Sequence, residues 1–187
     1  MDTDNQEKQK LSFTDFIKKN KIKVLSLIIL FVLFLIVVIV YSEYTKKQNS
    51  EISREFNKAK ILILNEKKEE AFKILDKIIF KKNKFYSTSS LNLIVENELV
   101  KDKGKILEYY DEIIKNTKLD KDTKDLLIFK KIIFIGDDIK ENELLSNLRP
   151  LMQSNSVWKG TVSDYIKQYY LSKNEFKKAT EFGKSLK

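Results

Sequence analysis

Few side chains in this sequence could do chemistry, and most of them are carboxylates or tyrosines. The 187 residues include neither histidine nor cysteine, which removes imidazole catalysis, thiol nucleophiles, disulfides and nearly every zinc site. One compact carboxylate pair, Asp137 and Asp138, follows Gly136. Two carboxylates without further oxygen ligands make a poor cation site. We therefore interpret Gly136 as a helix C-cap and the aspartates as N-capping residues of the next helix.

Two tyrosine pairs are the remaining candidates for a binding site: Tyr109 with Tyr110, and Tyr169 with Tyr170. Adjacent residues of a helix point about 100° apart, so one ring of each pair could be buried while the other lines a groove for an extended apolar peptide. Packing of these rings in the core is the default interpretation, and the groove is the alternative. Trp158 is interpreted as a wedge between helices rather than a ligand anchor.

Catalysis is not expected from this set of residues. The sequence offers no nucleophile with a neighbouring base, no metal-ligand set and, with only four glycines, no phosphate-cradling loop. We therefore predict a protein that is not an enzyme, takes no cofactor, metal or small-molecule substrate, and works through contacts with other proteins.

The formal net charge of +9 raises nucleic acid as a partner, but the kinds of basic residue argue against it. Only Arg54 and Arg149 are arginines among 36 basic residues, and arginine is the usual reader of phosphates and guanine. The lysines are also interspersed with 27 acidic residues. We expect no nucleic-acid partner.

A long apolar run near the start predicts a membrane anchor. Between Val24 and Tyr41, Ser26 is the one clearly polar residue before the closing tyrosine. Extended back to Ile22, the run is about 20 residues and would measure about 30 Å as a helix, the thickness of one hydrocarbon core. It has no polar face, as a soluble helix would have. We predict a transmembrane helix over residues 22–41, with its ends at Ile22 and Tyr41.

The residues that flank the run bear on its processing and orientation. A cleaved signal peptide has a shorter apolar core, about 7–15 residues, followed by a small-residue cleavage site. Ser42 to Lys46 show no such site, so we expect the anchor to be retained. A group of lysines directly precedes the uninterrupted apolar run that begins at Val24: Lys18, Lys19, Lys21 and Lys23. The positive-inside rule then places the tail, residues 1–21, in the cytoplasm and residues 42–187 across the membrane.

The rest of the chain shows helical spacing of apolar residues, without strand alternation or hairpin dipeptides. Short breaks separate the apolar stripes, which predicts eight helices with antiparallel neighbours. Pro150 is expected to end or bend its helix. The stripes begin at Ile52, Ala71, Leu91, Ile106, Leu126, Leu144, Trp158 and Phe176. The fifth stripe consists of Leu126, Phe129, Ile132 and Ile133.

A period near 35 residues runs through this region. A shift of 35 aligns Leu64–Ile79 with Leu99–Ile114, with five identities in sixteen positions. Ala71 and Ala179 are 108 residues apart, close to three periods, and both occupy small positions on apolar faces. A period near 34 is that of tetratricopeptide helix pairs. The predicted fold is all-α: a single transmembrane helix, then a tetratricopeptide-like α-solenoid of about four helix pairs over residues 42–187.

The order of these elements carries a resemblance. After the lysine-rich tail and the span come Lys68-Glu-Glu-Ala71-Phe, then Leu148-Arg-Pro-Leu151 with Trp158 seven residues later, and the closing Phe176-Lys-Lys-Ala179. Over nearly the whole chain, this order resembles the membrane-anchored tetratricopeptide-like family that includes the ancillary subunit of the bacterial Sec translocon.

The resemblance implies a place and partners. Family members are single-pass proteins of the bacterial inner membrane with the repeat domain in the periplasm. They act beside the Sec translocon, with a membrane-anchored prolyl-isomerase-like chaperone, on newly exported proteins. The residue pattern alone supports a membrane-tethered helical-repeat module for protein–protein interaction. A scaffold for another envelope assembly, such as division or cell-wall synthesis, fits that pattern equally and differs only in its partner.

Overall fold

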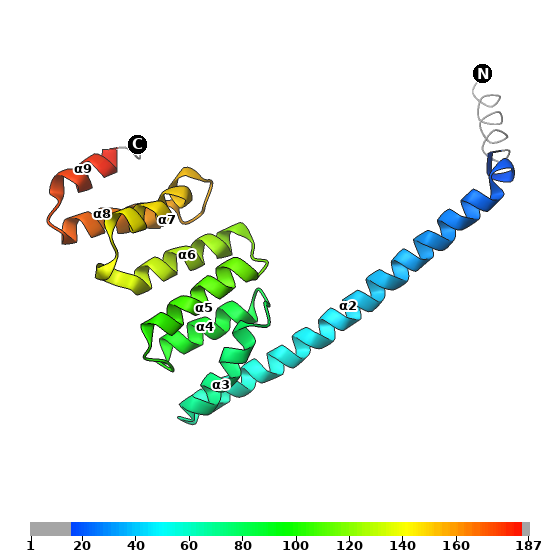
Figure 1. The fold of residues 1–187 in the computed structure, drawn as a ribbon, viewed down its shortest axis with the longest axis horizontal. Coiled ribbons are helices and arrows are strands. Elements are labelled where there is room, and N and C mark those ends of the chain that lie inside the picture. Colours follow the sequence, from blue (N-terminus) through cyan, green and yellow to red (C-terminus); the bar gives the residue numbers. More distant parts are fainter. Residues whose placement is uncertain (1–15, 185–187) are drawn as a thin grey trace, which may run out of the picture. The chain divides into compact units, whose positions relative to one another are not determined.

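The computed structural model describes residues 16–184, and within them the chain is helical and contains no strand (Figure 1). A helical turn at residues 16–19 comes first. The chain divides into two compact units, with the boundary between Glu51 and Ile52. The α-helices that follow the first turn are α2 (Lys21–Leu64), α3 (Lys68–Ile79), α4 (Tyr86–Glu96), α5 (Lys103–Asn116), α6 (Lys121–Ile135), α7 (Glu141–Gln153), α8 (Lys159–Ser172) and α9 (Phe176–Lys184), with a 3-10 turn η1 (Gly136–Asp138) between α6 and α7.

Helix α2 contains the predicted span and continues well beyond it. It is 44 residues long. The large apolar side chains from Leu25 to Tyr41 are between 43% and 71% exposed. By length and composition the helix can cross a membrane, with a mean hydropathy of 3.4 in its most apolar stretch. The four lysines that precede the span are exposed.

The second compact unit begins ten residues later than the predicted domain boundary after Tyr41. Residues 42–51 continue α2 as a helix, and nearly all of them are exposed. This stretch is polar apart from Tyr44, so it has no apolar stripe to bury. From Ile52 onward such a stripe exists, and Ile52, Ala59 and Leu62 are buried.

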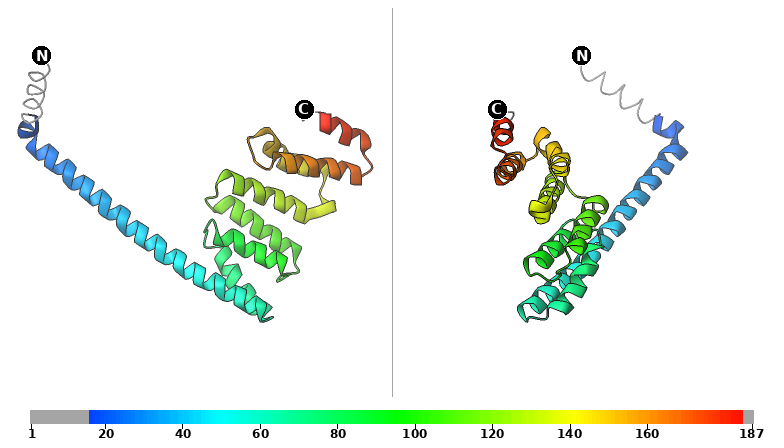
Figure 2. Two further views of the ribbon diagram at one scale, coloured as in Figure 1. Left: turned by 180° about the vertical axis from the view of Figure 1, so that it is seen from behind. Right: turned by 60° about the vertical axis from the view of Figure 1, so that its left-hand side comes forward.

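The second unit is a succession of antiparallel helices, and each of α3 to α8 packs on the helix that follows it. Helices α4, α5 and α6 lie side by side in both figures of the ribbon (Figures 1 and 2). Helix α3 also touches α5. Each predicted apolar stripe lies on one helix, from the second part of α2 to α9.

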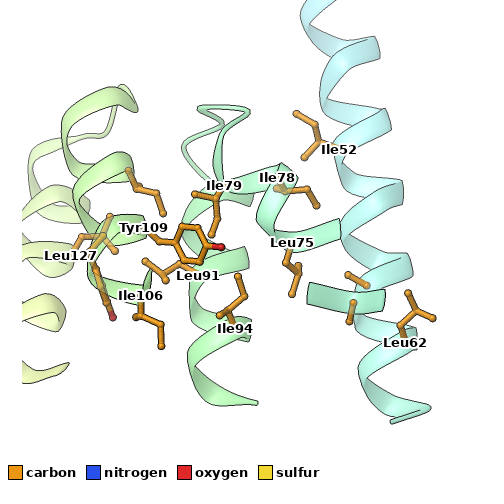
Figure 3. Close-up of a cluster of buried hydrophobic side chains, with 14 residues drawn as sticks. Ile52, Leu62, Leu75, Ile78, Ile79, Leu91, Ile94, Ile106, Tyr109 and Leu127 are labelled. Carbon is orange, nitrogen blue, oxygen red and sulfur yellow. The ribbon is translucent and has the colours of Figure 1, made fainter. Parts of the chain in front are cut away.

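The core consists of two clusters that share α6. The first joins the end of α2 to α3, α4, α5 and Leu127 of α6 (Figure 3). The second joins Phe129 and Ile132 of α6 to α7, α8 and α9. Ala71 is fully buried and Ala179 is nearly so, as predicted for small positions on apolar faces, and Ala59 is fully buried as well. Each fully buried Leu or Ile contributes about 1.5–3 kcal/mol of transfer free energy.

Side chains and backbone geometry end the helices. Asp102 accepts hydrogen bonds from the backbone N–H groups of Gly104 and Lys105, and Asp120 accepts one from Thr123. Gly136, at φ 72°, is the C-cap of α6, as predicted. The prediction that the following aspartates cap the next helix was wrong. They belong to the η1 turn, which displaces the start of α7 so that Lys140 is its N-cap.

Pro150 does not end its helix, contrary to expectation. Helix α7 continues to Gln153, and the Pro150 carbonyl still accepts the N–H of Ser154 at 3.2 Å. A proline costs a helix the bond that its missing N–H would make, and in the last turn that loss affects few neighbours. Trp158 does join helices as predicted, since its indole N–H donates to the Asp122 carbonyl in the first turn of α6 at 3.0 Å.

Candidate functional site

A cleft of about 210 Å³ lies between α4 and α6 and has residues of three helices in its walls. Helix α4 contributes Asn92, Val95 and Glu96. These residues are at positions i, i+3 and i+4, which lie on one face of a helix. The lining residues from the other two helices are Tyr110 of α5 and Lys130, Ile133 and Phe134 of α6.

Polar and apolar groups alternate across this cleft. The Lys130 ammonium donates to the Asn92 side-chain oxygen at 3.0 Å, which links the two walls. Ile133 is 46% exposed although it is a large aliphatic residue. The rings of Tyr110 and Phe134 lie 6.2 Å apart. Burial raises the pKa of Tyr110 to about 12, so its phenol stays neutral at physiological pH.

The cleft can hold part of a peptide but has no catalytic arrangement. An apolar side chain of a partner would gain contact with Ile133 and Phe134, while Lys130 and Glu96 could bond to its backbone or charges. Within residues 16–184, no group of three carboxylates lies close enough to hold a metal ion. A second hollow, about 310 Å³ along α7, is lined by residues of that helix alone and so has no opposite wall.

Three of the four candidate tyrosines are core residues, as the default interpretation of these pairs expects, and do not form an open groove together. Tyr109, Tyr110 and Tyr170 are at most 5% exposed, and Tyr169 is half-buried. The cleft reaches Tyr110 alone among them. Core packing, the default interpretation, therefore describes both members of the first pair, because α5 is covered on both sides by α4 and α6.

The tyrosine hydroxyls instead connect neighbouring helices. Tyr109 donates to the Asp76 carboxylate of α3, and burial together with that bond raises the pKa of Tyr109 above its usual value. Tyr169 donates to the Ile139 carbonyl at 3.2 Å, and Tyr170 donates to Glu141 at 3.0 Å. These bonds fix the helices against one another, which is a structural role.

Glu141 is the centre of a small charged network between α7, α8 and α9. The Lys178 ammonium lies 2.7 Å from Glu141 and 2.7 Å from Glu175. The hydrogen bond from Lys178, and the one from Tyr170, hold the pKa of Glu141 below its usual value. Lys178 also sits 5.5 Å from the centre of the Tyr170 ring. The network ties α9 to the preceding helices.

Most of the residues that line the cleft were not predicted from the sequence. The spacing of apolar residues assigned Ile133 to the buried stripe of its helix, together with Leu126, although Leu127 is buried instead. One signal was present: the second half of α6 reads Leu-Leu-Ile-Phe-Lys-Lys-Ile-Ile-Phe-Ile, which is more apolar residues than a single buried face requires. The additional apolar residues, Ile133 and Phe134, line the cleft.

No protein-family model matches this chain, and neither a curated protein sequence nor a solved structure is significantly similar to it. The function is therefore inferred from the α4–α6 cleft and the apolar first part of α2.

Proposed function

We propose that this protein is a membrane-tethered helical-repeat module that binds other proteins through the α4–α6 cleft. The observation that carries the proposal is α2, whose first part exposes an unbroken apolar surface while its last turns belong to the folded unit. A soluble protein rarely exposes a contiguous apolar patch above a few hundred Å². A bilayer around residues 22–41 would cover this surface and so remove the free-energy cost of exposing it to water.

We assign the helices of the second unit to four tetratricopeptide-like pairs: the end of α2 with α3, α4 with α5, α6 with α7, and α8 with α9. In this assignment Ala71 and Ala179 lie at equivalent places on the second helices of the first and last pairs. The cleft then lies between the first helices of two successive pairs. Repeat proteins use such a shared face to bind extended segments or partner helices.

The resemblance of the sequence supplies the partner. The proposed place is the bacterial inner membrane, with the lysine-rich tail in the cytoplasm and the repeat unit in the periplasm. The proposed role is that of an ancillary factor at the Sec translocon, assisting a membrane-anchored chaperone with exported proteins. Tethering raises the effective concentration of a partner in the same membrane, so a shallow cleft with weak intrinsic affinity is enough.

Photo-crosslinking in cells tests this function. A photoreactive amino acid at Ile133, in the cleft, is compared with one at Ile61, which is 58% exposed but lies outside the cleft. We expect crosslinks to the translocon, its chaperone or exported proteins from Ile133 only. Crosslinks to division or cell-wall proteins would establish the envelope-scaffold alternative. Equal labelling from both positions would contradict the cleft as the binding site.

The side of the membrane is tested separately. Because the chain has no cysteine, a single Lys177→Cys on the exposed surface of α9 reports its location without interference. A membrane-impermeant maleimide added to cells with a permeabilised outer membrane should label it. Labelling that appears only after the inner membrane is broken would show that the repeat unit is cytoplasmic.

A further inference from the structure

The two ends of the helix stack in the second unit differ in charge. The antiparallel helices send alternate loops to opposite ends. Three loops lie at one end: α3–α4, α5–α6 and α7–α8. Taken with four helical residues on either side, they cover residues 76–89, 113–124 and 150–162, which we call the basic end. It contains nine lysines and three acidic residues, a net of +6. The remaining loops, taken in the same way, contain nine lysines and eleven acidic residues, a net of −2.

Contacts between the loops confirm that each set shares one end. At the basic end, Lys84 lies close enough to Asp120 to lower the pKa of that carboxyl, after the larger effect of its bonds to Thr123. The Trp158 indole bonds to Asp122 there. At the opposite end, Lys68 donates to the Asn97 carbonyl at 3.1 Å. The ends are therefore physical surfaces rather than a grouping by sequence.

The α3–α4 loop concentrates charge and aromatic surface at the basic end. Its sequence is Phe80-Lys-Lys-Asn-Lys-Phe85. Phe80 is 49% exposed and Phe85 is 62% exposed, and all three lysines are exposed. Within residues 16–184, Lys81 and Lys82 have no ion-pair partner. Exposed aromatic rings between unpaired lysines are the combination that binds an anionic membrane surface, where rings enter the headgroup layer and ammonium groups meet phosphates.

The loop is held as a firm platform. The Asn83 side-chain oxygen accepts the N–H groups of Phe85 and Tyr86 at 3.1 and 3.0 Å. Ser87, fully buried, donates to the Ile78 carbonyl at 3.0 Å and so closes the loop from α3 to α4. The Phe80 ring packs edge-on against Tyr109, with centroids 6.2 Å apart. The phenylalanines therefore stay at the surface because the fold fixes them there.

The chain from the anchor enters the second unit at this same end. The Phe56 ring of α2 lies 5.5 Å from the ring of Tyr86, the first residue of α4. Only residues 42–51 separate Tyr41 from the start of the unit at Ile52, and ten helical residues measure about 15 Å. The anchor segment is therefore attached to the second unit at its basic end.

We propose that the α3–α4 loop, Phe80–Phe85, docks on anionic phospholipid headgroups of the membrane that α2 enters. The inference rests on the membrane anchor of the proposed function. Docking would give the second unit a second point of attachment and hold one end of the helix stack toward the lipid. The α4–α6 cleft would then be presented at a fixed height above the membrane.

A fluorescent probe on the full-length protein in lipid nanodiscs tests this. The environment-sensitive dye NBD is attached to Phe85→Cys or, as the matched control, to Phe176→Cys. Phe176 is 61% exposed and begins α9 at the opposite end. In nanodiscs containing phosphatidylglycerol, we expect a blue shift and a rise in NBD intensity at position 85 and neither at position 176. In nanodiscs of phosphatidylcholine alone, the shift at position 85 should be lost.

Charge dependence provides the second measurement. Raising the salt from about 0.1 M to 1 M shortens the screening length from about 10 Å to about 3 Å and should abolish the shift. Lys81→Gln combined with Lys82→Gln should do the same, and circular dichroism of this variant checks its fold. A shift at position 85 no larger than at position 176, or one insensitive to lipid charge, would overturn the proposal. Failure of the protein to enter nanodiscs at all would instead refute the anchor, and this inference with it.

Discussion

Helix α2 places the same kinds of side chain in two opposite environments. In its first part, residues 22–41, isoleucine, leucine, valine and phenylalanine are exposed on every side of the helix. In its last part, Ile52 is 4% exposed and Ala59 0%, while Ile61 remains 58% exposed. The last part has one apolar stripe that the folded unit covers, whereas the first has no polar face to turn toward water. The difference teaches that one continuous helix can expose apolar side chains on every side in one part and bury a single apolar stripe in the other.

Removing the first part should have the largest effect. A chain of residues 42–187 is expected to lose stable membrane insertion, because the apolar surface that drives insertion is gone, and to keep at most the salt-sensitive lipid binding proposed for the α3–α4 loop. It should still give a helical circular dichroism spectrum and a cooperative melt, unchanged by chelator or reductant. Membrane sedimentation measures the membrane binding of the truncated chain, and circular dichroism measures its fold. A truncated chain that is unfolded would show that the first part also supports the core.

A matched pair of leucine truncations compares the two environments directly. Leu75 of α3 is 0% exposed and Leu33 of the span is 54% exposed. Leu75→Ala should destabilise the second unit by about 2–5 kcal/mol, through lost transfer free energy and the cavity left behind. Leu33→Ala should leave the unfolding of that unit unchanged. Urea unfolding in detergent measures both, and equal losses would contradict the division of α2.

A small-to-large change at Ala59 examines the packed part alone. Ala59 is fully buried, so Ala59→Leu should cost about 1–3 kcal/mol through overpacking. Lys60→Leu introduces the same side chain one residue later, at an exposed position, and serves as the control. Thermal melts of the two variants should differ by several degrees. A melt of Ala59→Leu that matches the control would mean that α2 does not pack there.

The charged network at Glu141 should give the smallest effect. Because Lys178 lowers the pKa of Glu141 below 4.5, its contribution to stability is present above that pH and is lost as the pH falls through the lowered value. Glu141→Gln should therefore reduce stability at pH 6, by less than about 1 kcal/mol for so exposed a pair, and have no effect at pH 2. Urea unfolding at the two pH values measures this. Glu143→Gln, on the exposed side of α7, should show no such pH dependence.

Much of the fold could be predicted because short loops and apolar spacing are local signals. The helix positions followed from them, and the buried alanines Ala71 and Ala179 followed from the period. The end of α7 could not be predicted in this way, because a proline in the last turn removes only one hydrogen bond and the helix continues past it. The capping of α7 was misjudged because the η1 turn inserts extra residues between Gly136 and the helix.

The cleft was not predictable, because it depends on which apolar residues the neighbouring helices leave uncovered. Helix α6 is shared by both core clusters, so its apolar residues point in several directions. Spacing alone assigned Ile133 to the core and left Leu127 out, the reverse of the structure. The tyrosine pairs agree with the default interpretation of core packing, because both neighbours in a pair can be buried where helices cover two sides, as at Tyr109 and Tyr110.

The central claim is that α2 is a retained membrane helix that continues into the folded unit. The most direct measurement is alkaline carbonate extraction of membranes from expressing cells, followed by the intact mass of the protein. The account predicts that the protein stays in the membrane pellet with the mass of the whole 22.1 kDa chain. A soluble protein whose mature N-terminus lies after Tyr41 would contradict it, because the apolar run would then be a removed signal peptide.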